Sequence, residues 1–236
     1  MMLNRNHIRN GLAVLSIVGI APVVQAADPA QMTAAQCGGC HQLKGPASDS
    51  LQVRRDRKGP PLFYAGNKFR EDWLVGWLQK PVRLRPAGDF APAHVKASPK
   101  GEVVDPTTLG DHPVLDAGTA KEVASHLMTL RPNDALLAKE AYTPGGISPR
   151  MGAMDFVKFK GCGACHKDTP KYGGVSGPEL YTAWQRLQPA FIVSYIRDPK
   201  AWEPRSLMPN QHLNDGAIHK LANFLKVIGK KPEETK

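Results

Sequence analysis

The sequence predicts an all-α protein made of two similar helical domains in tandem. No segment shows sustained alternation of apolar and polar residues, which is the pattern of a half-buried strand. Several sequence landmarks occur twice at matching spacings along the 236 residues, which indicates one repeated unit. Near the end of each half, apolar residues recur at the i, i+4 and i+7 spacing of one helix face: Val123, Leu127 and Leu130, then Leu221, Leu225 and Ile228.

The repeat rests on four landmarks. Gly59-Pro60-Pro61-Leu62 in the first half corresponds to Gly177-Pro178-Glu179-Leu180 in the second. In both halves the leucine lies 11 residues before an aromatic residue, Trp73 or Phe191, which lies 8 residues before a proline, Pro81 or Pro199. In both halves 12 residues separate two further leucines, Leu115 from Leu127 and Leu213 from Leu225. Agreement across four landmarks predicts an internal duplication.

The predicted helices have recognisable ends. Asp28-Pro29 and Ser148-Pro149 each combine an N-cap residue with proline at the first helical position. The apolar segments that begin at Trp73 and Phe191 are expected to be helices, stopped by the prolines that follow. Asp116 and Asn214 occupy matching positions as N-caps of the last helix of each half.

These signals divide the chain into four parts. We expect a signal peptide over residues 1–26, a first domain over 27–131, a linker over 132–148 and a second domain over 149–236. The first domain is longer by about 20 residues, since Pro81 precedes Leu115 by 34 whereas Pro199 precedes Leu213 by 14. This insertion, at about 82–114, includes Pro86, Pro92, Pro99 and Pro106 and is expected to be an irregular loop.

The N-terminus predicts export. Arg5 and Arg9 precede an apolar run from Gly11 to Val24, and small residues follow it, as in a cleaved signal peptide. The alternative is a retained anchor helix, for which this run is short because a membrane span needs about 20 residues. We therefore expect a periplasmic chain with no transmembrane segment after cleavage.

All four cysteines fall in two Cys-x-x-Cys-His motifs, Cys37-Gly38-Gly39-Cys40-His41 and Cys162-Gly163-Ala164-Cys165-His166. This motif is typical of c-type haem attachment, in which two thiols form thioethers and the histidine binds the iron. A zinc ribbon is the rival, but its cysteine pairs are about 15–20 residues apart whereas these are 125 apart. The prediction is two haem c groups, with His41 and His166 as proximal iron ligands.

In their order of motifs, both halves resemble class I cytochrome c domains. The shared order is Cys-x-x-Cys-His, Gly-Pro-x-Leu, an aromatic-rich helix, a loop with an axial ligand and a final helix. The resemblance implies an all-α fold around each haem. It also implies that the carbonyls of Pro60 and Pro178 accept the N–H of the proximal imidazoles, which fixes the rings.

The distal iron ligands are expected to differ. Leu207-Met208-Pro209 fits the distal methionine that the resemblance implies for the second haem; Met151 and Met154 compete, but are expected to pack on an earlier helix. The matching loop of the first domain has no methionine. There His112-Pro113 is favoured as the ligand, with His94, Met128 or an open position as alternatives.

The expected function is electron transfer. Net charge is +2 from Ala27 to Tyr142 (15 basic, 13 acidic) and +6 from Thr143 to Lys236 (14 and 8), which favours redox partners with an acidic docking surface. Nucleic acid is not expected as a partner of an exported chain. The alternatives are a cytochrome subunit of a larger dehydrogenase or oxidoreductase, and an enzyme whose first haem has an openable distal position.

Overall fold

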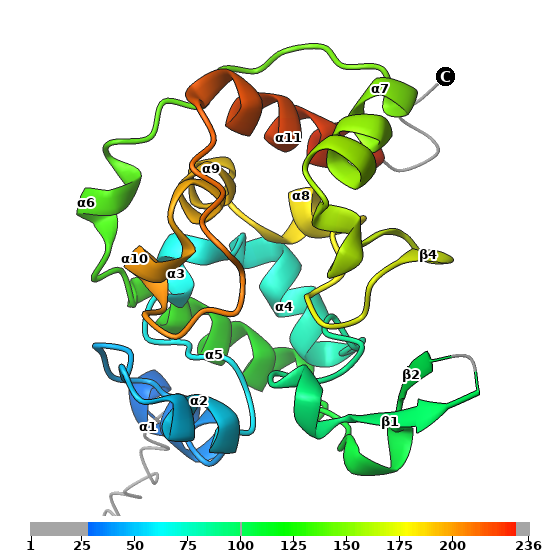
Figure 1. Cartoon of the computed structure of the whole chain (residues 1–236). Helices are drawn as coiled ribbons and strands as arrows, with labels where there is room; N and C mark the ends of the chain where they lie inside the picture. The colour runs from blue at the N-terminus through cyan, green and yellow to red at the C-terminus, as the bar shows by residue number, and fades with distance from the viewer. Residues whose placement is uncertain (1–27, 100, 230–236) are drawn as a thin grey trace, which may run out of the picture.

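The computed structural model describes residues 28–99 and 101–229. It is mostly helical, with 48% helix and 7% strand, so the predicted helical class is confirmed at this level (Figure 1). The predicted signal peptide lies outside the described residues. Within them, no helix has the length and apolar character needed to span a membrane.

The helices follow one another in two similar series. The first half contains α1 (Pro29–Cys37), α2 (Leu51–Asp56), α3 (Ala65–Lys68), α4 (Glu71–Gln79), η1 (Ala91–Ala93), η2 (Pro106–Thr108) and α5 (Ala117–Thr129). After α6 (Asp134–Leu137), the second half contains α7 (Pro149–Met154), η3 (Asp155–Phe159), η4 (Cys162–Ala164), α8 (Ala183–Arg186), α9 (Pro189–Arg197), α10 (Pro199–Trp202) and α11 (Asp215–Ile228). Two antiparallel hairpins complete the structure: β1 (Val95–Ser98) with β2 (Gly101–Val104), and β3 (Lys167–Thr169) with β4 (Tyr172–Gly173).

The repeated landmarks fall on equivalent elements. The bounds of α3 and α4, shifted by 118 residues, give the bounds of α8 and α9. Likewise α5 and α11 begin 98 residues apart. The predicted apolar stripes face the core, since Val123, Leu127, Leu221 and Leu225 are all buried. The helical pattern of the repeat is therefore present in the structure, although the domain boundaries themselves stay a prediction.

The predicted N-caps are confirmed. The side chains of Asp28 and Ser148 accept backbone N–H groups at the starts of α1 and α7, and those of Asp116 and Asn214 do so at α5 and α11. Each such bond satisfies an N–H that lacks a partner inside the helix. The first and last helices of each half thus begin at the residues that the capping pattern predicts.

The two halves meet through equivalent residues. Phe69 and Leu187, which are 118 residues apart, form an antiparallel bridge. The Arg70 N–H donates to the Arg186 carbonyl at 3.0 Å, and the Gln188 N–H donates to the Lys68 carbonyl at 2.9 Å. These two bonds exchange when the halves are exchanged, as in a two-fold symmetric dimer. The buried apolar residues of both halves form one continuous core around this contact.

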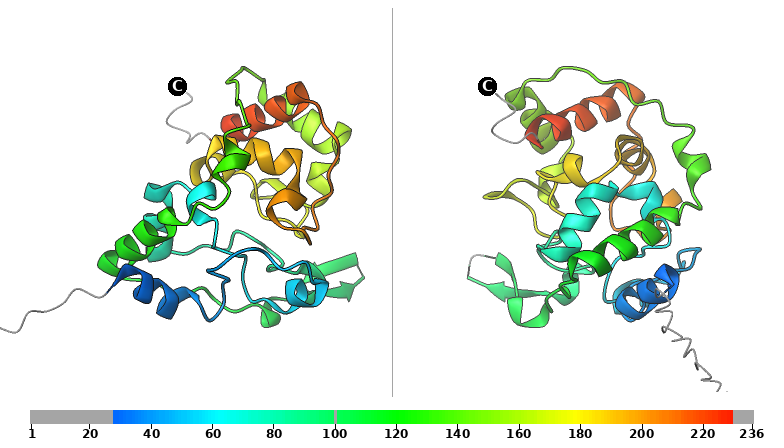
Figure 2. Two further views of the ribbon diagram at one scale, coloured as in Figure 1. Left: turned by 90° about the vertical axis from the view of Figure 1, so that its left-hand side faces the viewer. Right: turned by 180° about the vertical axis from the view of Figure 1, so that it is seen from behind.

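The insertion and the linker are more ordered than the sequence predicted. The expected irregular loop at 82–114 contains η1, the β1–β2 hairpin and η2, and Figure 2 shows the hairpin projecting from the first half. The prediction missed these strands because four-residue strands are too short to establish an alternating pattern. The predicted linker includes α6 and runs along the outside of the molecule between α5 and α7 (Figure 1).

Candidate functional site

Both Cys-x-x-Cys-His motifs form tight turns that follow a helix. In the first, α1 ends at Cys37, and the His41 N–H donates to the Cys37 carbonyl at 2.9 Å. In the second, the His166 N–H donates to the Cys162 carbonyl at 3.0 Å. All four cysteines are free thiols, and the second thiol of each motif is on an exposed residue. Each turn therefore presents two thiols and an imidazole within five residues.

The two motif histidines are held in the same way. Nδ1 of His41 lies 2.7 Å from the Pro60 carbonyl oxygen, and Nδ1 of His166 lies 2.7 Å from that of Pro178. A carbonyl only accepts hydrogen bonds, so each Nδ1 carries the proton and donates it. Each Nε2 is consequently left with a free lone pair, as a metal-ligating histidine requires.

A glycine beside each proline makes room for the ring. A Cβ added to Gly59 would lie 2.5 Å from Cε1 of His41, and one added to Gly177 would lie 2.5 Å from Cε1 of His166. Such a separation is well inside van der Waals contact, so a side chain at either position would displace the imidazole. The repeated Gly-Pro pair thus serves both sites: the glycine clears space and the proline carbonyl orients the ring.

Both motifs open onto one cavity. It has a volume of about 1660 Å³ and is lined by both histidines and by apolar residues of α4, α9, α5 and α11. All four motif cysteines, Cys37, Cys40, Cys162 and Cys165, also lie on its wall. A typical ligand pocket measures about 300–1,000 Å³. This cavity is therefore large enough for two bulky apolar groups side by side.

His112 lies opposite His41 in the first site. The two ring centroids are 6.2 Å apart, and two imidazoles bound on opposite sides of one metal ion have centroids about 6 Å apart when the metal–nitrogen bonds are about 2.0–2.1 Å long. Nδ1 of His112 is 2.8 Å from the Pro113 carbonyl oxygen, so Nδ1 donates to a carbonyl here as it does in His41 and His166. The Trp77 ring packs against it with centroids 4.6 Å apart.

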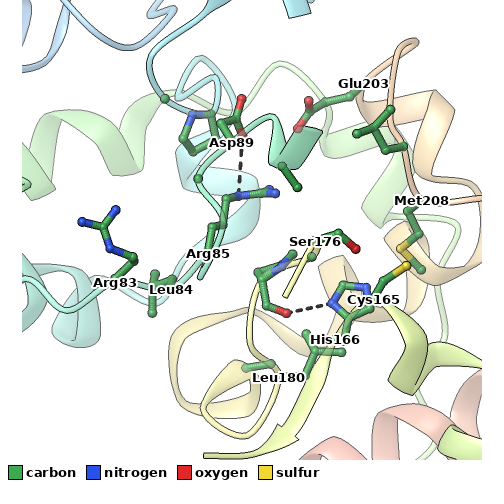
Figure 3. Close-up of a pocket in the computed structure, with 18 of the residues that line it drawn as sticks. Arg83, Leu84, Arg85, Asp89, Cys165, His166, Ser176, Leu180, Glu203 and Met208 are labelled. Atoms are coloured by element: carbon green, nitrogen blue, oxygen red, sulfur yellow. Dashed lines mark hydrogen bonds and ion pairs between the residues drawn. The ribbon is translucent and has the colours of Figure 1, made fainter. Parts of the chain in front are cut away.

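Met208 lies on the same cavity as His166, and in Figure 3 its side chain extends toward the part of the wall where Cys165 and His166 lie. Contacts with a side chain of α9 hold the loop that carries Met208. The Met208 N–H donates to Ser206 Oγ at 3.3 Å, and that hydroxyl is 3.2 Å from the hydroxyl of Tyr195. Tyr195 occupies the position equivalent to Trp77, so the same helix position supports the distal loop in both halves.

The alternative distal ligands differ in their position relative to the cavity. His94 also lines the cavity, but its Nδ1 is 2.9 Å from Thr108 Oγ1 on the insertion. Met128, Met151 and Met154 do not line it. The packing prediction is wrong for Met151, which is 53% exposed, because α7 buries its face at Gly152 and leaves Met151 on the solvent side.

Burial keeps the site groups neutral. It lowers the pKa of His41 and His166, although the proline carbonyls act in the opposite direction. It raises the pKa of the Cys37 and Cys162 thiols to about 11. The imidazoles are therefore in the uncharged form that binds metals.

Sequence reasoning missed a group of charged residues in the centre of the cavity. Asp89 accepts from Arg54 and Arg57, and Arg57 also donates to Glu203 of the second half at 2.5 Å. Burial alone would raise the pKa of Asp89 and Glu203, but the surrounding arginines hold both below their ordinary values. No local sequence pattern marks these residues, since they come from distant segments of both halves.

Comparisons of the chain with protein-family models, with curated proteins and with solved structures found no match. The interpretation of the site therefore rests on its own geometry. Paired thiols, singly protonated imidazoles and a large apolar cavity fit covalently attached haem at both motifs.

Proposed function

We propose that the protein is a periplasmic electron carrier with two covalently bound haems. The observation that carries the proposal is the matched pair of Cys-x-x-Cys-His turns, each with its histidine Nδ1 held 2.7 Å from a proline carbonyl on the wall of one cavity. A zinc site is less well supported, because the described residues contain no group of three or more His, Cys, Asp or Glu side chains arranged to hold a metal ion.

In this proposal, Cys37 and Cys40 hold one haem and Cys162 and Cys165 the other. A bound haem supplies an iron that takes up and releases one electron at a potential set largely by its axial ligands. His41 and His166, which Pro60 and Pro178 keep from rotating, would supply one iron ligand each, and His112 and Met208 would supply the second ligand of the first and the second haem.

Rigid support of these ligands suits electron transfer. Trp77 packs on His112, and the Tyr195–Ser206 pair holds the backbone of Met208. The apolar helices around the cavity exclude water from the haem. A site that changes little between oxidation states exchanges electrons without a large reorganisation cost, and it leaves no position for a substrate.

The two distal ligands give the carrier a direction. A thioether stabilises ferrous iron, whereas an imidazole is the stronger donor to ferric iron, so the His112 site should have the lower potential. Electrons would then pass from the first haem to the second and on to an acceptor. The +6 charge of the second half supports an acceptor with an acidic docking surface.

Mass spectrometry of the exported protein tests the proposal. Two haem additions on a chain that begins near Ala27 or Asp28 are expected, and free thiols in the native protein would contradict it. Carbon monoxide or cyanide should bind neither haem, since both irons have six ligands. Rapid binding at the first haem would instead favour the enzyme alternative.

A further inference from the structure

The insertion of the first half forms part of the wall of the second site. The Glu179 N–H donates to the Leu84 carbonyl at 2.7 Å, and the Ala87 N–H donates to the Val175 carbonyl at 3.2 Å. The segment 84–87 therefore runs alongside the segment that carries Pro178, whose carbonyl orients His166. The second half contains no equivalent insertion, so this support is not reciprocated.

Arg85 lies at the middle of this segment. It lines the cavity that also contains His166, and Figure 3 shows both side chains on that cavity's wall. Its side chain is 22% exposed, and its ion pair to Asp89 is long at 3.6 Å. Asp89 is already bound by Arg54 and Arg57, so most of the five N–H donors of the Arg85 guanidinium stay free for another acceptor.

The charges around Arg85 do not balance. We call Arg54, Arg57, Lys68, Arg85 and Arg186 the central cationic cluster; all five line the cavity. Among the described residues, three buried carboxylates accompany these five cations: Asp89, Glu203 and Glu179, which pairs with Arg186. The four arginines alone outnumber these carboxylates by one, and Lys68 adds positive charge whenever it is protonated; unpaired charge away from water is costly.

Two further observations indicate that the cluster accepts an anion. Nε of Arg54 and Nε of Arg186 are buried without a hydrogen-bond partner. Lys68 Nζ lies 5.0–5.7 Å from three aromatic ring centroids, and burial together with nearby Arg85 lowers its pKa to about 7. A negatively charged group in the cavity would pair with donors that the protein itself does not satisfy.

We propose that Arg85, carried by the insertion of the first half, binds a carboxylate of the haem held by the second motif. This inference rests on the proposed function, since haem c brings two propionate carboxylates into the cavity. It gives the insertion a role: one half supplies a charge that the other half's cofactor requires. The reduction potential of the second haem would then depend on the contact between the two halves.

The test compares Arg85→Gln and Arg85→Lys with Arg55→Gln in the two-haem protein. Arg55 is a matched control because it lies on the same half and lines the same cavity, but its side chain is 55% exposed and pairs with exposed Asp56. Arg85→Gln should lower the potential of the second haem, since an unpaired carboxylate favours ferric iron. A tenfold change in the reduction equilibrium, or about 59 mV for one electron, is the expected order. Arg85→Lys should retain most of the wild-type potential.

The outcomes separate the two proposals. If mass spectrometry finds no haem, the proposed function fails. If both haems are attached but Arg85→Gln moves the second potential no more than Arg55→Gln does, the role of Arg85 is overturned. An equal shift of both potentials would also overturn it, because that result indicates a remote charge rather than a bond to one haem.

Discussion

The two sites are alike on one side and different on the other. The motif histidines His41 and His166 have the same 2.7 Å bond to a proline carbonyl, and a Cβ added to the neighbouring glycine would lie the same 2.5 Å from each ring. The distal sides share only the supporting helix position, at which Trp77 packs on His112 whereas Tyr195 reaches Met208 through Ser206. If the proposed function is correct, the duplicated unit has kept the parts that attach a haem and changed the part that sets its potential.

The largest expected effect is on the number of covalently attached haems, and it should follow from removal of both thiols of one site. Cys162→Ala with Cys165→Ala should reduce the covalent haem count from two to one, and the same changes at Cys37 and Cys40 should do likewise. Mass spectrometry measures both. Retention of two covalent haems in either variant would contradict the assignment of one motif to each haem.

Substitution of the distal methionine should alter one site alone. Met208→Ala should abolish the weak sulfur-to-iron absorption band and lower the potential of the second haem, because the thioether that favours ferrous iron is lost. Met151→Ala is the matched control, since Met151 is exposed and outside the cavity. Survival of the band in Met208→Ala would show that another residue is the ligand.

The contact between the halves should depend on a buried acid. Glu203 of the second half accepts hydrogen bonds from Arg57 and from Tyr64 of the first. Glu203→Gln should lower the free energy of unfolding by about 3 kcal/mol, since Arg57, whose side chain is largely buried, then keeps only Asp89 as an ionic partner. Asp111→Asn, which weakens only an exposed pair with Arg83, should cause no measurable change in chemical denaturation.

Low pH should reduce the difference in unfolding free energy between the wild type and Glu203→Gln. The pKa of Glu203 is lowered from 4.5 in the folded chain: burial acts to raise it, but Arg57, Arg85 and Lys68 prevail. Its stabilising contribution is thus present above about pH 4.5 and is lost as the pH falls through the lower folded pKa. Unfolding curves of the wild type and Glu203→Gln should converge below that pH. A constant gap would mean that ionised Glu203 contributes nothing.

A smaller and symmetric effect is expected at the two glycines. Gly59→Ala and Gly177→Ala should each cost about 1–3 kcal/mol of stability through overpacking against the motif histidine. Gly76 is the control, because a Cβ there meets nothing within 4 Å and alanine favours the interior of α4 by about 1 kcal/mol. Unequal costs at Gly59 and Gly177 would show that the proximal sides are less alike than their distances indicate.

Local chemistry accounts for what the sequence predicted. N-caps such as Asp116, helix-stopping prolines such as Pro81 and the apolar stripe through Leu127 all act within a few residues, so a pattern can reveal them. The bonds from His41 to Pro60 and from His166 to Pro178 were anticipated because the resemblance supplied them. The helix α10 was not anticipated, although Asp198 caps it and Pro199 begins it, since Pro199 was interpreted only as a stop.

What the sequence did not predict depends on tertiary contacts. Arg85 and Asp89 lie in the segment expected to be irregular. Asp89 pairs with Arg54 of α2 and with Arg57, and Arg57 also pairs with Glu203, 114 residues beyond Asp89 in the chain. The pairing of Phe69 with Leu187 likewise needs both halves in place. Charge clusters of this kind have no sequence period, so only the folded chain brings them together.

Potentiometric titration of the wild type and His112→Met, followed by absorption and paramagnetic resonance spectra, tests the central claim most directly. Axial ligands tune haem potentials over roughly 0.8 V, so the wild type should show two resolved one-electron waves, the lower from the first haem. His112→Met should bring the waves closer together, whereas His94→Met should leave them apart. Two indistinguishable waves in the wild type, or a first haem with the higher potential, would contradict the account.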